Sequence, residues 1–276
     1  MTGVAEVYEP TERTTVNRYK TRANYDHVTI HGIIDSCPVL HVSFNPTSVD
    51  DDPFPTILPM IGCTGSYTSP NANETSAVSV YLHGHASSRF MKLPTVHSES
   101  DDTTYSNLPG TPVCIAATHM DGVVLALTPF NHSCNYRSAV VHGYASIVTD
   151  PAEKLYALRI MTDSLIPSRW DHCRVPPTPA ELTATTVLRV EIIGASAKIR
   201  AGPPGNDRAD LDDPAMRQRV WTGVVPSWVT WGTPVPAEEN MVQTVPDYIS
   251  EFVKGENEKG EGYATEITGK VLTSKK

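Results

Sequence analysis

The sequence predicts a mainly β protein, a β-barrel with helices at its rim. At least six segments between residues 39 and 199 are rich in Val, Ile, Thr and Tyr, the residues enriched in strands. Several of these segments alternate polar and apolar residues, the period of a half-buried strand. Turn residues separate most of them, and only two positions carry a strong helix-start signal.

The first element expected is a short helix over residues 25–35. Its apolar residues Val28, Ile30, Ile33 and Ile34 fall near one helical face, and Pro38 would end it. Residues 1–24 before it are polar and are expected to form a loose arm.

Strands dominate the region that follows. Segments 39–44 and 56–63 are interpreted as a hairpin joined by the acidic loop 45–54. Further strands are expected at 76–86, 111–120, 122–130, 138–149 and 183–199. Another acidic loop is expected at 101–107, and Asp121-Gly122, a dipeptide typical of hairpin turns, is expected to reverse the chain.

Two helices interrupt the strands. Asp150 is a suitable N-cap, followed by Pro151 in the first helical position and Glu153 three residues after the cap. Pro167 ends that helix, and Thr178 starts a second one. Residues 220–231 are apolar and Trp-rich, and the sequence from residue 236 onward is rich in Glu, Lys and Gly. We therefore expect an arm over 1–24, one barrel domain over 25–232 and an appendage over 233–276.

Charge and composition exclude several classes of function. The formal net charge is −9 and the pI is near 5.5, which argues against nucleic-acid binding and against a polybasic membrane-surface protein. No apolar run approaches the roughly 20 residues needed to span a bilayer. The N-terminus lacks the apolar core of a secretory signal, and the five cysteines are odd in number and widely spaced. We expect a cytoplasmic protein with reduced thiols and no metal site.

The densest polar cluster, NHSCNYRS at 131–138, lies between two apolar strands. Arg, Ser and Asn side chains could cradle an anion there, because a guanidinium offers a planar fork of donors. A solvated connection stabilised by Asx and Ser turns explains the same residues. The residues leave both interpretations open.

Two smaller clusters also carry polar side chains. His83 and His85 would face one side of a strand, but no carboxylate or cysteine completes a metal site, so histidines hydrogen-bonded at a strand end are favoured. Ser88 and Arg89 follow and could meet a phosphate. Lys198 and Arg200 would share one strand face, interpreted as a solvated basic edge. No nucleophile elbow, zinc-protease helix or kinase signature is present.

At these clusters the sequence resembles the pyridoxamine 5'-phosphate oxidase-like FMN-binding split-barrel superfamily, and within it the flavin-nucleotide-binding branch with the nitroimidazole-resistance proteins. The strings that carry the resemblance are VYLHGHASSR (80–89), PVCIAATHMDGVVLA (112–126), FNHSCNYRSAVVHG (130–143) and ASAKIRAGPPGNDRADL (195–211). The resemblance covers about residues 13–226. It implies a six-stranded split β-barrel that forms a homodimer.

The resemblance also implies an FMN at the dimer interface, with FAD or haem as alternative cofactors. Ser88 and Arg89 would meet the phosphate together with Tyr136, Arg137 and Ser138. Asn135 and Thr118 would lie near the ribityl chain or ring edge, and Ser133 joins the cofactor-binding residues. His83 matches a histidine near the flavin face, and we expect it to act as a hydrogen-bond or proton donor to the substrate.

Three functions compete on this basis. The first is an FMN-dependent oxidoreductase acting on a small organic molecule. The second is a non-catalytic flavin-binding or sensing protein whose acidic tail docks a partner. The third is a haem-binding relative with His83, His85 or His132 as axial ligand. The C-terminal substrate motif of pyridoxamine phosphate oxidase itself is not recognised in this sequence.

Overall fold

The computed structural model describes residues 6–45, 54–69, 78–93 and 109–269. Residues 46–53 of the acidic loop predicted at 45–54, and the whole loop predicted at 101–107, lie outside these residues. The chain forms two compact units. The first comprises Met1–Arg18, Ala23–Ala117 and Ser138–Ala197, and the second comprises Tyr19–Arg22, Thr118–Arg137 and Lys198–Lys276.

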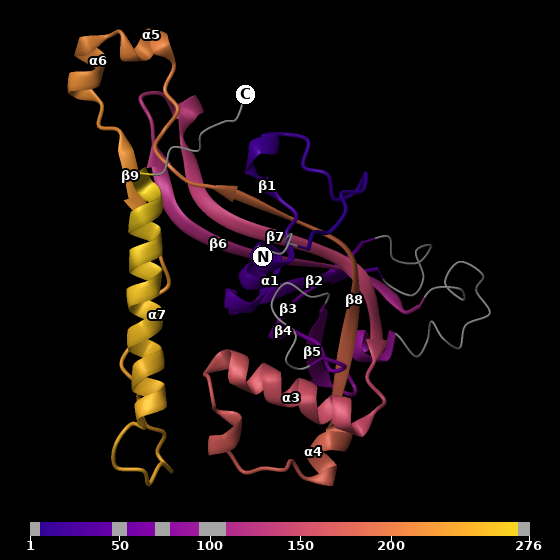
Figure 1. The fold of residues 1–276 in the computed structure, drawn as a ribbon. Helices are drawn as coiled ribbons and strands as arrows, with labels where there is room; N and C mark the ends of the chain where they lie inside the picture. The colour runs from indigo at the N-terminus through magenta and orange to yellow at the C-terminus, as the bar shows by residue number, and fades with distance from the viewer. Residues whose placement is uncertain (1–5, 46–53, 70–77, 94–108, 270–276) are drawn as a thin grey trace, which may run out of the picture. The chain divides into compact units, whose positions relative to one another are not determined.

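The sheet follows the order β3-β2-β6-β7-β8-β5-β4 (Figure 1), and its strands β6, β7 and β8 each include residues of both units. Its strands are β2 (Leu40–Phe44), β3 (Thr56–Met60), β4 (Gly62–Gly65), β5 (Ser79–His85), β6 (Thr111–Leu125), β7 (Ser133–Ile147) and β8 (Thr185–Arg200), and the two-residue β1 (Ala23–Asn24) pairs with β8. The pairings of β2 with β3 and β6, and of β5 with β4 and β8, are antiparallel. Ile61 alone separates β3 from β4, so one chain segment joins the two ends of this order. A mainly antiparallel sheet with flanking helices is thereby confirmed.

The core of the first unit lies between this sheet and its helices. Fully buried apolar residues alternate along β2 and β6, as at Leu40, Val42, Ile115 and Ala117. Helix α1 (His27–Ser36) adds Ile30, Ile33 and Ile34, which confirms the predicted helix and three residues of its apolar face. The fourth, Val28, is 40% exposed and does not belong to the buried face. Its N-cap is Asp26, whose Oδ1 accepts a hydrogen bond from Thr29 N at 2.8 Å.

The two capped helices also form where their local signals predict them. Helix α3 (Pro151–Leu165) begins after Asp150, whose side chain accepts from Ala152 N. Helix α4 (Pro179–Ala184) has a complete capping box between Thr178 and Glu181. Helix α3 contacts β4 and β5 (Figure 1). It therefore covers one part of the sheet in the first unit.

The predicted hairpin at Asp121-Gly122 is wrong, because β6 continues through both residues. Val123, Val124 and Leu125 pair with the short strand β9 (Gly223–Pro226) in the second unit. A Cβ atom at residue 122 would lie 2.8 Å from the carbonyl oxygen of Val225. Glycine is needed here for close approach of two strands rather than for a turn.

Two further predictions differ from the structure. Residues 133–138 belong to β7 and do not form a loop. The described residues contain nine strands, where the sequence pattern predicts seven segments and the family resemblance implies a six-stranded barrel. The segments predicted at 111–120 and 122–130 belong to the single strand β6, and the segment predicted at 56–63 is divided at Ile61 into β3 and β4. Strands β1 and β9 were not predicted, because segments of two and four residues are too short to show an alternating pattern.

The second unit contains a long C-terminal helix, α7 (Asp247–Glu266), where the sequence pattern predicts only an appendage. Helix α7 contacts β9 (Figure 1). Asn257 holds it to the preceding segment by donating to Trp231 O at 2.9 Å and accepting from Trp231 N at 2.7 Å. Further helices are α5 (Arg208–Leu211) and α6 (Pro214–Arg219), and residues 89–93 are also helical. The 3-10 turns are Lys20–Arg22, Pro129–Asn131, Trp170–His172 and Ile267–Gly269. Within the described ranges, no helix has the length and apolar character needed to cross a membrane.

Replacing Gly143 by alanine is expected to destabilise the protein by about 1–3 kcal/mol. The added Cβ would collide with the carbonyl oxygen of Glu191 on β8 and would lie 2.8 Å from Val190 Cγ1. Gly32→Ala is the matched control, because a Cβ there meets nothing within 4 Å and helix α1 should gain roughly 0.5–1 kcal/mol. Urea unfolding measures both changes. Equal stabilities of the two variants would contradict this account of Gly143.

Candidate functional site

The predicted cofactor-binding cluster lies on β7, whose alternation divides it between two faces. Ser133, Asn135 and Arg137 face one side, and Cys134, Tyr136 and Ser138 face the other. Asn135 is completely buried, and its side-chain nitrogen Nδ2 has no hydrogen-bond partner in the described structure. A buried donor left unsatisfied costs roughly 1–3 kcal/mol, so Asn135 marks a position where a bound group could supply an acceptor.

Arg137 is paired with a buried carboxylate. Its Nη2 lies 2.8 Å from Asp121 Oδ1 and its Nε lies 3.1 Å from Asp121 Oδ2, and Asp121 is only 3% exposed. The guanidinium carbon also lies 4.1 Å from the ring centroid of Tyr263 on α7. The charge of Arg137 is therefore already balanced within the second unit.

Arg200, in contrast, is a buried cation without an acidic partner. It is 6% exposed, and its guanidinium donates to Asn135 Oδ1, to Gly202 O at 3.2 Å and to Pro203 O at 3.1 Å. Within the described ranges no Asp or Glu forms an ion pair with it. Burial, and then the neighbouring charge of Arg22, lower the pKa of Arg200. The interpretation of Arg200 as part of a solvated basic edge is therefore wrong.

Two other cations of the second unit lie near one aromatic ring, and, after burial, the charge of one of them, Arg22, lowers the pKa of Arg200. The guanidinium carbon of Arg22 lies 4.1 Å from the ring centroid of Tyr19, and Lys198 Nζ lies 5.9 Å from the same centroid. We call Arg22, Asn135, Lys198 and Arg200 the Arg200 cluster. The sequence signal for it is the alternation Lys198-Ile199-Arg200 before GPPG, which by itself does not distinguish a buried cation from an exposed one.

The other predicted site residues are divided between the two units. Thr118 is exposed on β6 in the second unit, whereas His83, Ser88, Arg89 and Ser138 belong to the first. Ser88 N donates to His85 O at 2.8 Å in the turn after β5, and Arg89 is exposed at the start of a helical segment over 89–93. His83, Ser88 and Arg89 therefore come from one strand, the turn that follows it and the start of the next helical segment.

His83 is half-buried on β5, and its Nδ1 has no hydrogen-bond partner among the described residues. Burial lowers the pKa of His83 below its ordinary value of 6.5. The imidazole is therefore neutral at pH 7, the form that either donates one hydrogen bond or ligates a metal.

Stability is expected to fall as the pH decreases below about 6.5, the ordinary pKa of histidine. His142 also has a lowered pKa, through burial and then the charge of Arg13. Because the unfolded chain binds these two protons more readily than the folded one, acid favours unfolding. Urea midpoints at pH 7.5 and 5.5 measure the loss, and the double variant His83→Gln, His142→Gln should show a smaller one. His41→Gln is the control, because His41 is exposed. An equal pH dependence in all three proteins would contradict this assignment.

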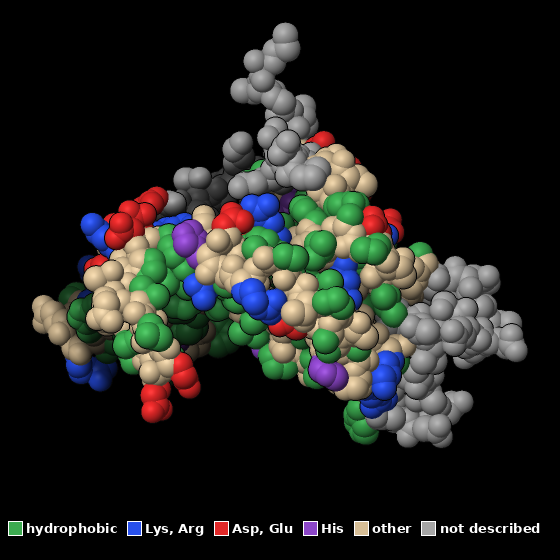
Figure 2. Space-filling model, turned by 90° about the horizontal axis from the view of Figure 1, so that it is seen from below, with side chains coloured by type: hydrophobic (Ala, Val, Ile, Leu, Met, Phe, Trp, Pro, Cys, Tyr) green, Lys and Arg blue, Asp and Glu red, His purple; other side chains and the backbone are tan. Residues whose placement is uncertain are grey.

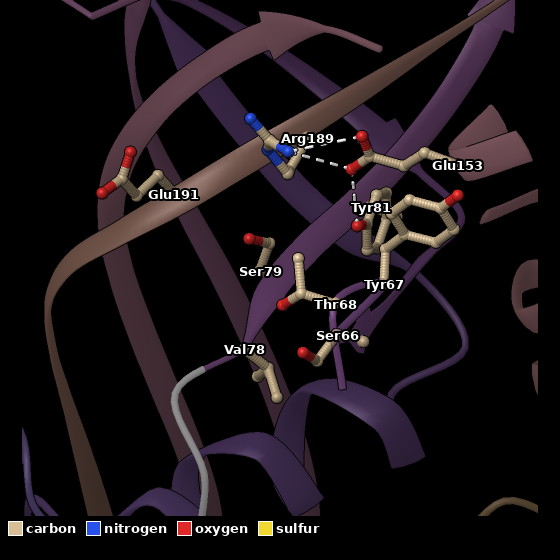
Figure 3. A pocket seen from close by; sticks show the side chains of 10 residues that line it. Ser66, Tyr67, Thr68, Val78, Ser79, Tyr81, Glu153, Arg189 and Glu191 are labelled. Carbon is tan, nitrogen blue, oxygen red and sulfur yellow. Dashed lines mark hydrogen bonds and ion pairs between the residues drawn. The ribbon is translucent and has the colours of Figure 1, made fainter. Parts of the chain in front are cut away.

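A separate polar pocket lies in the first unit (Figure 3). It encloses about 300 Å³ and contains none of the predicted site residues. The lining residues are Gly65, Ser66, Tyr67, Thr68, Val78, Ser79, Tyr81, Glu153, Arg189 and Glu191.

Hydrogen bonds join three of these residues. Glu153 of α3 accepts from Tyr81 Oη at 2.9 Å and from Arg189 Nη1 at 3.0 Å. Burial and the bond to Glu153 raise the pKa of Tyr81, so the phenol remains a donor. No motif in the sequence identifies this pocket. Arg189 and Glu191 come 36 and 38 positions after Glu153 in the sequence, and the three residues line one pocket only in the folded chain.

The fold and the Arg200 cluster together define an antiparallel barrel protein with a buried cation that lacks an acidic partner in the described chain. The chain belongs to the pyridoxamine 5'-phosphate oxidase family, whose model matches residues 26–199. This confirms the family predicted from the sequence strings.

Comparison with solved structures agrees with this assignment. The chain is similar to the flavocytochrome Anf3 from Azotobacter vinelandii, with 29% identity and a TM-score of 0.69 over 89% of this chain and 98% of that one. It is also similar in fold to a FAD and haem binding protein from Mycobacterium smegmatis, with 24% identity and a TM-score of 0.65 over 84% of this chain and 97% of that one. None of the curated proteins with which the sequence was compared matches it.

Proposed function

We infer that the protein binds a flavin nucleotide, FMN in the first instance, and acts as an oxidoreductase on a small organic molecule. The observation that carries this proposal is Arg200, a buried cation with no acidic partner in the described chain. Burying an uncompensated charge is costly, and a phosphate group would compensate it. The unpartnered Nδ2 of Asn135 beside Arg200 adds a donor suited to an oxygen of the same ligand.

The residues present fit a phosphate-bearing cofactor. Arg22 and Arg200 would supply positive charge to the phosphate, and Asn135 would donate a hydrogen bond. Arg137 would contribute less to phosphate binding, because Asp121 already balances its charge. The contacts proposed from the family resemblance remain Ser88, Arg89, Thr118, Ser133, Tyr136 and Ser138.

A bound flavin supplies hydride or single-electron transfer, chemistry that no protein side chain provides. The chain's own contribution would be to hold the flavin by its phosphate and to orient the substrate. His83, neutral at pH 7, would give a hydrogen bond to the substrate. The substrate remains defined only as a small organic molecule.

We also propose a homodimer in which both copies contact the flavin. Several large apolar side chains of the second unit are exposed, including Trp221 at 65%, Val235 at 88% and Met241 at 89%. Figure 2 shows hydrophobic side chains reaching the surface on the face drawn, with Lys and Arg interspersed among Asp and Glu. Exposed apolar surface of this kind favours association. If sizing of the flavin-loaded protein shows a monomer that keeps its flavin on dilution, this model of the site is wrong.

The absorption spectrum of the purified protein, followed by mass analysis of the released chromophore, tests the cofactor. Oxidised flavin bands with an FMN or FAD mass would support flavin binding, and turnover with an electron donor would then distinguish an oxidoreductase from a flavin carrier. A protein that is colourless and takes up no added FMN would contradict the proposal.

Haem is a second candidate because the similar protein Anf3 is named a flavocytochrome. His83, with its neutral imidazole and unpartnered Nδ1, is the histidine whose state best suits an axial ligand. A Soret band that disappears in His83→Ala and persists in His41→Ala would favour this function.

A further inference from the structure

The pocket of the first unit presents charges of both signs at fixed positions. Arg189 and Glu191 are two residues apart on β8, so their side chains leave the same face of the strand with Cα atoms roughly 6–7 Å apart. On the neighbouring strand β5, Tyr81 pairs with Arg189 and Ser79 pairs with Glu191. Two charged and two hydroxyl-bearing side chains thus lie in a rectangle along one wall of the pocket (Figure 3).

Glu153 holds Arg189 in place and leaves part of its guanidinium free. Both contacts of Arg189 with Glu153, at 3.0 and 3.3 Å, use Nη1. Within the described chain, Nη2 and Nε form no hydrogen bond with a side chain, and the side chain of Arg189 is 45% exposed. Glu153 is buried and accepts from Tyr81 as well, so its own oxygens are occupied. Arg189 therefore offers a preorganised edge to an anionic group.

Glu191 offers the opposite charge. It is exposed at the pocket, and no described cation forms an ion pair with it. Ser66, Thr68 and Ser79 add hydroxyl groups that either donate or accept hydrogen bonds. Figure 3 shows these hydroxyls on the side of the pocket that lies between Glu191 and the Tyr81–Glu153–Arg189 group.

The charge balance selects the class of ligand. A simple anion would be repelled by Glu153 and Glu191 together, and a simple amine would be repelled by Arg189. A molecule that carries both a carboxylate and an ammonium group could pair the first with Arg189 and the second with Glu191. The volume of about 300 Å³ is at the small end for ligand pockets, which suits a molecule of the size of an amino acid.

We propose that this pocket binds a free amino acid, with its carboxylate on Arg189 and its ammonium group on Glu191. The site is independent of the proposed flavin site, because none of the Arg200 cluster lines it. The hydroxyl-bearing residues of β5 and of the segment after β4 would form hydrogen bonds with the bound amino acid.

Calorimetric titration of the full-length protein with each of the twenty free amino acids tests this proposal. At least one should bind, and its N-acetyl and carboxamide derivatives should each bind at least tenfold more weakly. Glu191→Gln should weaken binding at least tenfold, whereas Glu239→Gln, the same charge change at an exposed position outside the pocket, should not. Arg189→Lys keeps a positive charge near Glu153 but loses the planar guanidinium that can donate two hydrogen bonds to a carboxylate, so it should also weaken binding.

Three results would overturn the proposal. One is the absence of heat with all twenty amino acids in a protein that unfolds cooperatively. The second is equal affinity of the parent protein and Glu191→Gln for the amino acid that binds best. The third is binding of acetate or ethylamine as tightly as that amino acid, which would contradict the two-charge assignment. These outcomes do not depend on whether the protein carries flavin, so the two sites are tested separately.

Discussion

Replacing Arg200 by methionine is expected to weaken FMN binding about 10- to 150-fold. The methionine keeps most of the aliphatic volume but removes a charge-assisted contact worth roughly 1.5–3 kcal/mol. The affinity for riboflavin, which lacks the phosphate, should change much less, so the ratio of the two affinities isolates the phosphate contact. Flavin fluorescence quenching measures both affinities on the same preparation.

A control and a competing variant make this result specific. Arg208→Met removes a cation whose side chain is 93% exposed, and should leave both affinities unchanged. Arg137→Ala tests the contact expected from the family resemblance, and we expect a smaller loss because Asp121 balances that cation. If Arg137→Ala abolishes the preference for FMN over riboflavin and Arg200→Met does not, the phosphate lies at Arg137 instead. Far-UV circular dichroism of each variant separates lost binding from lost folding.

Replacing Asp121 by alanine should cost about 3 kcal/mol of unfolding free energy, near the lower end of the effects of breaking a buried ion pair. Asp121 is 3% exposed, and its carboxylate accepts from two nitrogens of Arg137. Without it, the guanidinium of Arg137, whose side chain is 25% exposed, would have only the ring of Tyr263 to compensate its charge. Urea denaturation of the apoprotein gives the difference directly.

The exposed pair Arg208–Asp212 provides the comparison for this measurement. Its side chains are 93% and 70% exposed, and Asp212→Ala should change stability by less than about 1 kcal/mol. The double variant Asp121→Leu, Arg137→Met should recover part of the loss, because neither charge then remains buried without a partner. A cost below about 1 kcal/mol for Asp121→Ala would contradict this prediction, because it would show that the Asp121–Arg137 pair contributes no more to the free energy of unfolding than an exposed pair does.

The sequence alone determined the features that depend on neighbouring residues. Asp150 and Thr178 cap helices where their local patterns predict them, since an N-cap needs only the side chain and the next three backbone nitrogens. The strand-forming residues of segments 39–44 and 138–149 likewise predict β2 and most of β7. The strings near 80–89 and 130–143 were sufficient for the family, because such strings are specific without any knowledge of contacts.

Only the tertiary structure decided the features that depend on residues far apart in the chain. Asp121-Gly122 is strand and not turn because β9, a hundred residues later, lies against it. Arg200 is buried because Asn135 and the carbonyls of Gly202 and Pro203 surround it, whereas its strand pattern alone suits an exposed edge equally well. The proposed amino-acid pocket joins residues 65–68, β5, α3 and β8, and no local pattern predicts which side chains of four separate segments meet. Long-range packing therefore decided the sites, while local hydrogen bonding and periodicity determined the elements that carry them.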